Sequence, residues 1–369
     1  MLISNFLKKY KLSMVFSLSI LPLLSVVGLP IYIIYNGIVW QEPTMFFVLW
    51  FLAGTGITIG YHRLFAHRSF KTYTVIEWLA MLCGSMALQN SITKWCSDHR
   101  RHHRKLDTDQ DPYSIKEGFF HAHIGWILKN TQSNIENVSD LQKKSAVKFQ
   151  DRHYWKISLF LSFILPALIG LLYGRPIGGL IWGGILRVTM VHHFTFFINS
   201  LCHYIGKRDY DIHTSAKDSW FMALFTFGEG YHNYHHKFEW DYRNGIKWYN
   251  FDPSKWIIKF LSFFKITYSL KKASDYNIFK AKIDTLLEKI NLASNETLDK
   301  KYSSKISKIM ESALSNLSLL KKLEIKYRAI DKAGFSKNEY KKQISICKYK
   351  IQKSLASLMT ILVNIKSLV

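Results

Sequence analysis

The sequence has few cysteines and no paired cysteine motif. Its four cysteines are scattered along 369 residues, and no two of them form a C-x-x-C pair. This spacing argues against a disulfide framework and against the cysteine-rich kind of structural zinc site. We therefore expect reduced residues that pack in the interior: Cys83, Cys96, Cys202 and Cys347.

Acidic residues are also scarce. The chain has 26 Asp and Glu residues against 50 Lys and Arg residues, which gives a formal net charge of +24. Such an excess predicts an anionic surface nearby, either a nucleic acid or the cytoplasmic leaflet of a membrane. Long apolar segments favour the membrane, so we expect membrane lipid and no nucleic acid as a partner.

Charge is absent from one long stretch near the N-terminus. No charged residue lies between Lys11 and Glu42, a gap longer than the ~20 residues that cross a bilayer. Because this run exceeds the apolar core of a signal peptide, we expect a span that is retained. Four transmembrane helices are predicted in all, at about residues 12–35, 45–60, 157–173 and 179–203.

Basic residues flank the predicted hairpins. Residues 8–11 and 63–68 are basic, which predicts that both ends of the first hairpin face the cytoplasm. We expect a multi-pass protein of a bacterial inner membrane or endoplasmic reticulum, with both termini cytoplasmic. Arg187, His192 and His193 lie inside the fourth span and should face protein or a wet cavity. Residues 75–91 predict a helix at the membrane interface.

The composition changes after about residue 271. Residues 1–270 are predicted to form one membrane domain, and residues 271–369 a basic, cytoplasmic helical extension. Apolar residues recur at helical spacing in two parts of this extension, with a predicted turn at 331–336 between them. No catalytic motif is visible in the extension.

Histidines gather in three clusters. Two clusters place histidines at i, i+3 and i+4, where a helix would offer three side chains to a shared centre. Imidazole suits zinc, copper, iron or nickel, and eight histidines without cysteine fit two metal ions better than one. The third cluster holds His62 and His67, which an ideal helix would turn about 140° apart. We therefore expect the helix to end or unwind between these two residues.

These motifs resemble those of a known family. The matching residues are His62-x4-His67, Asp98-His99-Arg100-Arg101-His102-His103, Asp109-x-Asp111-Pro112-Tyr113, Asn199-x3-His203 and Gly228-Glu229-Gly230-Tyr231-His232-Asn233-Tyr234-His235-His236. Over roughly residues 12–256 the chain is similar to the membrane fatty acyl desaturases, most closely the stearoyl-CoA Δ9-desaturases. The resemblance implies an all-α membrane fold, with four transmembrane helices under a cytoplasmic cap that holds two iron ions.

The resemblance also implies a reaction and its partners. It implies oxygen-dependent desaturation of a long-chain saturated fatty acyl-CoA, giving a cis double bond, expected at Δ9. Dioxygen and an electron donor are the other implied partners. Because no His-Pro-Gly-Gly haem motif is present, we expect a separate donor protein, cytochrome b5-like or ferredoxin-like. No catalytic residue is expected beyond the metal ligands, which are His62, His67, His99, His102, His103, Asn199 through water, His203, His232, His235 and His236.

Other motif residues are candidates for supporting roles. Those expected near the substrate are Gln89, Asn90, Trp95, Asp98 and Lys129. Those that could orient imidazole N–H groups are Asp98, Asp109, Asp111, Glu229 and Asn233. The arginines of the second motif, Arg100 and Arg101, together with Arg104, could bind a substrate phosphate or anchor the cap to lipid.

Departures from the family pattern leave alternatives open. Ser97 stands where animal acyl-CoA desaturases carry a basic residue that contacts the CoA phosphates. An acyl-lipid or acyl-carrier-protein desaturase is therefore a second hypothesis, and a related di-iron hydroxylase is a third. A non-catalytic membrane metal-binding protein is the hypothesis from another class. Metal content separates it from the enzymes, because two irons per chain favour an enzyme.

Overall fold

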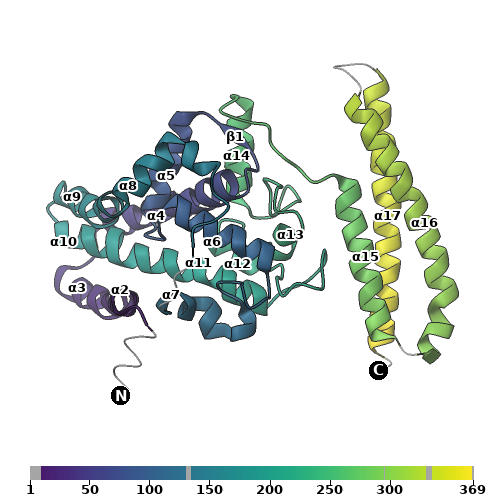
Figure 1. Cartoon of the computed structure of the whole chain (residues 1–369), viewed down its shortest axis with the longest axis horizontal. Helices are drawn as coiled ribbons and strands as arrows, with labels where there is room; N and C mark the ends of the chain where they lie inside the picture. The colour runs from purple at the N-terminus through teal and green to yellow at the C-terminus, as the bar shows by residue number, and fades with distance from the viewer. Residues whose placement is uncertain (1–9, 130–133, 295, 330–334, 368–369) are drawn as a thin grey trace. The chain divides into compact units, whose positions relative to one another are not determined.

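The structure, a computed structural model, describes residues 10–129, 134–294, 296–329 and 335–367. It is mostly helical and divides into two compact units (Figure 1). The first unit comprises Met1–Gly206 and Ser215–Lys272, and the second comprises Lys207–Thr214 and Ala273–Val369. The boundary predicted at residue 271 is close to this division, although the short segment 207–214 belongs with the second unit. That the two units act as separate domains stays a prediction.

In the part of the first unit that the structure describes, four helices are long and apolar enough to cross a membrane. The first is Leu12–Asn36, built from α2 (Leu12–Leu23), η1 (Leu24–Gly28) and α3 (Leu29–Asn36). The second is Gln41–Ala66, built from α4 (Gln41–Thr55) and η2 (Gly56–Ala66). The third is Ser145–Leu171, built from α8 (Ser145–Leu159), η6 (Phe160–Ile164) and α9 (Leu165–Leu171). The fourth is Pro176–Tyr204, built from α10 (Pro176–Gly179), η7 (Leu180–Leu186) and α11 (Arg187–Tyr204).

The predicted helical fold with four spans is confirmed, and two of the helices extend beyond the predicted spans. The second helix continues six residues beyond the predicted end at residue 60, and the third begins twelve residues before the predicted start at residue 157. The added residues include charged or polar side chains, such as His62 and Arg63 in the second helix and Asp151 and Arg152 in the third. Hydropathy locates only the part of a helix that suits hydrocarbon, whereas backbone hydrogen bonding continues beyond it.

Polar residues inside the fourth helix face protein, as expected. Arg187 is completely buried. Its guanidinium donates to the backbone carbonyls of Gly183 (3.0 Å), Ser162 (3.1 Å) and Met86. His192 Nε2 lies 2.8 Å from the carbonyl oxygen of Ala87. These contacts satisfy side chains that would be costly in lipid.

Shorter elements complete the first unit and carry most of the histidines. The α-helices are α5 (Thr74–Ser85), α6 (Ile92–Lys105), α7 (Trp126–Leu128), α12 (Trp220–Phe225), α13 (His232–Lys237) and α14 (Pro253–Phe263). The remaining turns are η3 (Ile115–Glu117), η4 (His121–Gly125) and η5 (Leu141–Lys143). Strand β1 (Lys71–Thr72) pairs antiparallel with β2 (Thr267–Tyr268). Helix α5 forms within the segment predicted as interfacial, and its place at the membrane stays a prediction.

The described residues of the second unit form three helices. They are α15 (Asp275–Ala293), α16 (Glu296–Ala329) and α17 (Phe335–Lys366). Apolar residues of all three pack together, including Ile283, Leu320 and Ile351. The predicted helical extension is confirmed, and α15 is an addition to it. The predicted turn at 331–336 lies mostly outside the described residues.

Candidate metal centre

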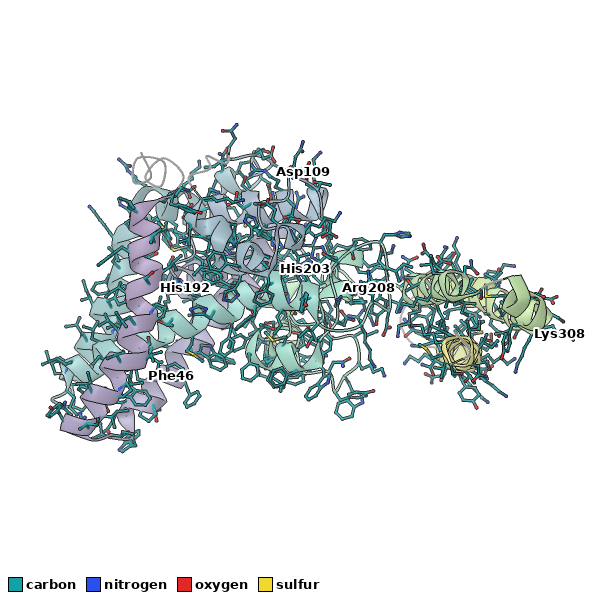
Figure 2. The ribbon with its side chains drawn as sticks, turned by 90° about the horizontal axis from the view of Figure 1, so that it is seen from below. Phe46, Asp109, His192, His203, Arg208 and Lys308 are labelled. Carbon is teal, nitrogen blue, oxygen red and sulfur yellow. The ribbon has the colours of Figure 1, made fainter. Side chains whose placement is uncertain are left out.

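Four helical elements, with the residue that follows one of them, bring the nine predicted histidine ligands together. Helix α6 carries the second cluster, and α13 carries the last one. His62 lies in η2, His67 follows it, and His203 lies near the end of α11 (Figure 2). The second and fourth membrane spans, which contain α4 and α11, thus place histidines at their ends beside the short helices α6 and α13.

A widened helical turn aligns His62 with His67. The helix ends between them, as expected, because η2, which has π-helical hydrogen bonding, ends at Ala66 and His67 is its C-cap. The backbone N–H of His67 donates to the carbonyl of His62 at 3.0 Å, five residues earlier. Such i+5 bonding places residues five apart on one face. The two imidazole rings consequently lie 4.7 Å apart between centroids.

The nine imidazoles form two groups. In each group the nearest ring nitrogens all lie within 4.8 Å of one another. One group contains His62, His67, His99, His103 and His235, and the other contains His102, His203, His232 and His236. Two neighbouring groups of this kind could hold two metal ions.

Each i, i+3, i+4 motif serves both groups, which corrects the expectation of one shared centre per motif. In α6, His99 and His103 join the five-histidine group while His102 joins the other. Residues i and i+4 are about 40° apart around a helix, whereas residues i+3 and i+4 are about 100° apart. Adjacent histidines therefore point to different centres.

The ring nitrogens have the spacing that a metal ion requires. Within the five-histidine group, His62 Nε2 and His103 Nε2 each lie 3.0 Å from His235 Nε2. Within the other group, His203 Nε2 and His236 Nε2 each lie 3.0 Å from His232 Nε2. Metal–imidazole bonds of about 2.1 Å at right angles would separate two nitrogens by about 3.0 Å. The residues present thus fit metal ligation.

The protonation state of the imidazoles also suits a metal. Burial, followed by the neighbouring imidazoles, lowers the pKa of His99, His235 and His236 well below its ordinary value. Neutral imidazole keeps the lone pair that a metal ion needs. Protonation of these rings would place several positive charges within a few ångströms.

The Nδ1 atoms of four of these rings lie next to a carboxylate or a hydroxyl group. His62 Nδ1 lies 3.0 Å from Glu229 Oε2, and His102 Nδ1 lies 2.8 Å from Asp111 Oδ1. Both of these carboxylates were predicted from the sequence. Such partners fix the orientation and tautomer of a ligating imidazole.

Two further partners were missed by the sequence analysis. His103 Nδ1 lies 3.0 Å from Glu239 Oε2. His203 Nδ1 lies 2.7 Å from Ser215 Oγ, which donates to Asp107 Oδ1 at 2.5 Å. Glu239 stands four residues after His235 in the sequence, but the resemblance contained no motif there.

Three other predicted supporting residues have surroundings that include groups other than imidazole, and their role in orienting the rings stays a prediction. Asp109 is exposed at the edge of the first unit (Figure 2). Asn233 Nδ2 donates to the carbonyl of Ala216 at 3.0 Å. Asp98 forms an ion pair with Lys94. Sequence spacing alone does not tell which carboxylate of a motif turns toward a ring.

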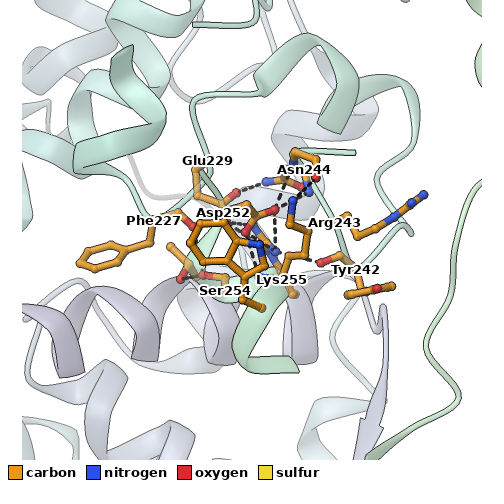
Figure 3. A network of polar contacts seen from close by, with 12 residues as sticks. Phe227, Glu229, Tyr242, Arg243, Asn244, Asp252, Ser254 and Lys255 are labelled. Atoms are coloured by element: carbon orange, nitrogen blue, oxygen red, sulfur yellow. Dashed lines mark hydrogen bonds and ion pairs between the residues drawn. The ribbon is translucent and has the colours of Figure 1, made fainter. Parts of the chain in front are cut away.

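A buried ion network supports the five-histidine group (Figure 3). Arg63 lies 3.0 Å from both Glu229 and Asp252, and all three side chains are at most 4% exposed. Asn244 Nδ2 donates to Glu229 Oε2 at 2.6 Å. Burial alone would raise the pKa of Glu229, but His62 and Arg63 hold it below its ordinary value. Glu229 therefore stays ionised opposite the imidazole.

The arginines of α6 have carboxylate partners in the protein, and only Arg100 is buried. Arg100 donates to Asp140 at 2.7 Å and to the carbonyls of Ala66 and Phe65. Arg101 pairs with Glu136 at 2.9 Å, as Arg104 does at 2.8 Å. The buried guanidinium of Arg100 thus links α6 to η2. This structural role is neither of the two expected ones, which were to bind a substrate phosphate or to anchor the cap to lipid.

A cavity of about 700 Å³ reaches both groups of histidines. His62 and His99 of one group and His232 of the other line it. Apolar side chains from all four spans contribute to its wall, including Ile20, Trp50, Phe163 and Phe196. The predicted substrate residues also line it, as does Asn199: Gln89, Asn90, Trp95, Asp98 and Lys129. The volume is within the range of small-molecule sites.

Comparison with known proteins agrees with this arrangement. The family model for fatty acid desaturases matches residues 42–264. This chain belongs to the fatty acid desaturase family. All nine histidines of the two groups lie within the matched residues.

Relatives within the family include two yeast proteins. The probable acyl-CoA desaturase of Schizosaccharomyces pombe is 44% identical over 261 residues, which are 69% of this chain and 54% of the relative. Acyl-CoA desaturase 1 of Saccharomyces cerevisiae is 40% identical over 65% of this chain and 48% of the relative. This desaturase family member thus spans about half the length of those two relatives. Delta-9 acyl-lipid desaturase 1 of Arabidopsis thaliana is 36% identical over 64% of this chain and 77% of the relative.

Proposed function

We propose that this protein desaturates a long-chain saturated fatty acyl-CoA, leaving a cis double bond at Δ9. The observation that carries the proposal is the cavity, whose apolar wall ends at imidazoles of both groups. The overall reaction takes two hydrogens from adjacent methylenes, and with dioxygen, two electrons and two protons it yields two waters. Family membership and the names of the yeast relatives support this reaction.

Two iron ions are the proposed cofactor. The ligands would be the five histidines of one group and the four of the other. Asn199, which lines the cavity one helical turn before His203, is proposed as a ligand through water. Bound iron would supply the redox chemistry that attacks an unactivated C–H bond.

The chain's own residues position the rings and the substrate. Glu229 and Asp111 hold two imidazoles in orientation from outside. Trp95 stacks on His99 with 4.8 Å between ring centroids and also lines the cavity. An acyl chain against Trp95 would therefore lie beside the five-histidine group. Holding one methylene pair there, away from water, is the main task of the protein.

An acyl-lipid desaturase is the second candidate. Two cations at the cavity already have carboxylate partners, because Lys129 pairs with Glu117 and Lys94 with Asp98. The Ser97 hydroxyl accepts a hydrogen bond from the backbone N–H of Glu136 at 2.9 Å. A CoA phosphate would have to compete for these cations, whereas a lipid headgroup of lower charge would not.

The electron donor and the orientation in the membrane complete the proposal. We place both termini and the histidine groups on the cytoplasmic side, because basic residues flank that end of the spans. The donor would be a separate cytochrome b5-like or ferredoxin-like protein. An acidic donor would suit the basic chain.

Product analysis tests the proposal. Full-length protein in bilayers, given stearoyl-CoA, dioxygen and a reductant with its donor protein, should yield oleoyl-CoA by gas chromatography. Stearoyl phospholipid in the same membranes is the matched substrate for the second candidate. His235→Ala, which removes a ligand, should yield neither product.

Metal analysis separates the proposal from its non-catalytic alternative. The enzyme should hold about two irons per chain. One zinc or no metal in folded protein, together with unchanged acyl chains, would favour a membrane metal-binding protein. Iron-loaded protein that hydroxylates the chain without desaturating it would point to a hydroxylase.

A further inference from the structure

Helix α14 presents an apolar face outward. Its exposed residues include Trp256, Phe260, Phe263 and the following Phe264, which are 42%, 60%, 71% and 63% exposed. These positions are i, i+4, i+7 and i+8, so they share one side of the helix. The opposite side is buried, with Ile258 completely covered. A water-facing helix would normally have the reverse pattern.

The base of α14 is fixed to the second membrane span. Ser254 Oγ lies 2.7 Å from Thr58 Oγ1 and donates to the carbonyl of Phe227 at 3.1 Å. The Phe227 ring packs on Trp50 of the same span, with 4.8 Å between centroids. Helix α14 thus begins beside the membrane-spanning helix and below the level of His62.

The depth of this contact can be worked out from helix geometry. Thr58 precedes the end of the span at Ala66 by eight residues, or about 12 Å at 1.5 Å per residue. The whole span of 26 residues is about 39 Å long, about 9 Å more than the hydrocarbon thickness. If all of this excess lies at the Ala66 end, Thr58 is about 3 Å inside the hydrocarbon, and if it is shared equally, Thr58 is about 7–8 Å inside. The contact with Thr58 therefore lies within the outer few ångströms of the hydrocarbon.

Cations accompany the aromatic face. Lys259 Nζ lies 4.8 Å from the centroid of the Phe263 ring, and Lys265 follows the helix. Both lysines are exposed. Lysine beside Trp and Phe is typical of helices at a membrane surface, where the ammonium reaches the phosphates and the rings enter the lipid.

The strand after α14 connects it to α5. Tyr268 of β2 lies opposite Lys71 of β1, and the rings of Tyr268 and Tyr73 are 5.7 Å apart. Helix α5 follows Tyr73 directly and has its own exposed apolar residues, including Val75 at 69%. The aromatic face is therefore joined to the segment that the sequence predicts to lie at the interface.

We propose that α14 is a second interfacial helix, which immerses Trp256, Phe260, Phe263 and Phe264 at the boundary between headgroups and hydrocarbon. The occupant of this face is lipid, with anionic headgroups near Lys259 and Lys265. This inference does not depend on the reaction that the protein catalyses.

Spin labels test which occupant covers the face. Single cysteines replace Phe260 or Phe263 in a Cys83→Ser background, because the other three native cysteines are buried. Val26→Cys is the lipid reference, since Val26 is 73% exposed on the first span. Lys116→Cys, at an exposed position of η3, is the water reference. Full-length protein is placed in vesicles of phosphatidylcholine and phosphatidylglycerol.

Collision rates with oxygen and with a neutral nickel chelate decide the result. Oxygen concentrates in lipid and the chelate in water. The proposal expects the oxygen-to-nickel ratio at both positions to exceed that of K116C and to approach that of V26C. A ratio like that of K116C would overturn it. Low collision rates for both reagents would also overturn it, by showing that protein covers the face, and spin–spin broadening would identify that protein as a second copy. Unchanged thermal unfolding of each labelled protein checks its fold.

Discussion

Replacement of Glu229 by glutamine should weaken both metal binding and the fold. The carboxylate has three buried partners. It lies 3.0 Å from His62 and from Arg63, and it accepts from Asn244 at 2.6 Å. Glutamine keeps the shape but removes the charge, and its amide NH₂ must face a group that is itself a donor. The Arg63 guanidinium would then have only Asp252 as an anionic partner among these residues.

The expected magnitude follows from burial. Removing one partner of a buried ion pair costs about 3–5 kcal/mol. We expect about 3 kcal/mol for E229Q, since Asp252 still balances part of the Arg63 charge. Loss of a group that orients a metal-binding histidine lowers metal affinity about 10- to 100-fold. Each tenfold loss corresponds to about 1.4 kcal/mol.

Glu239→Gln is the matched control. Glu239 also lies 3.0 Å from the Nδ1 atom of a candidate ligand, His103, but its side chain is 47% exposed against 4% for Glu229. An exposed pair is worth only about 0–1 kcal/mol. Iron affinity by chelator competition and thermal unfolding in bilayers are the assays. Equal losses in E229Q and E239Q would refute the argument from burial.

Three further outcomes are expected. The His102→Ala/His103→Ala double variant should lose both irons by elemental analysis, because the two rings belong to different groups; one retained iron would show that the motif serves a single centre. Gly54→Ala should destabilise the protein by about 1–3 kcal/mol, because a Cβ there would overlap the Phe227 ring; an unchanged thermal midpoint would contradict this. The buried environment of Asp140 would raise its pKa, yet its arginine partner holds the pKa below 3.8; its contribution to stability is therefore present above pH 3.8 and lost on acidification, so unfolding midpoints of Asp140→Asn and the parent protein should converge below that pH.

The sequence was sufficient for the spans and for the nine histidines. Runs without charge can be recognised from the order of residues alone, and so can the recurrence of His at i, i+3 and i+4. The resemblance supplied His203, which has no histidine neighbour at helical spacing. What the sequence could not supply was the division of ligands between the two groups, because that depends on how α6 and α13 face each other.

Contacts between distant segments were harder to predict. Arg63 stands in the sequence as a basic residue after an apolar run, which suggested only membrane orientation. In the structure it is 1% exposed and joins Glu229 to Asp252, about 170 and 190 residues later. No local pattern marks such a partner. The same holds for Ser215 and Asp107, whose contact with each other depends on tertiary packing.

The outward aromatic face of α14 was missed for another reason. The helix is too short and too charged to be recognised as a membrane span. A search for hydrophobic runs also does not tell on which side of a helix each apolar residue lies. Only the burial of Ile258 and exposure of Phe260 show that its apolar residues lie on both sides. Membrane contact from a helix of this length is visible only after the fold is known.

The division of each histidine motif sets the spacing of the two groups of imidazoles, because neighbouring residues of one helix belong to different groups. Neighbouring residues supply the paired rings, with centroids 5.7 Å apart for His102 and His103 and 5.6 Å apart for His235 and His236. Helices α6 and α13 thus impose nearly the same separation on the rings that they carry. Loops or bound substrate could tilt the site, but separating the two groups of rings would require unwinding a helix.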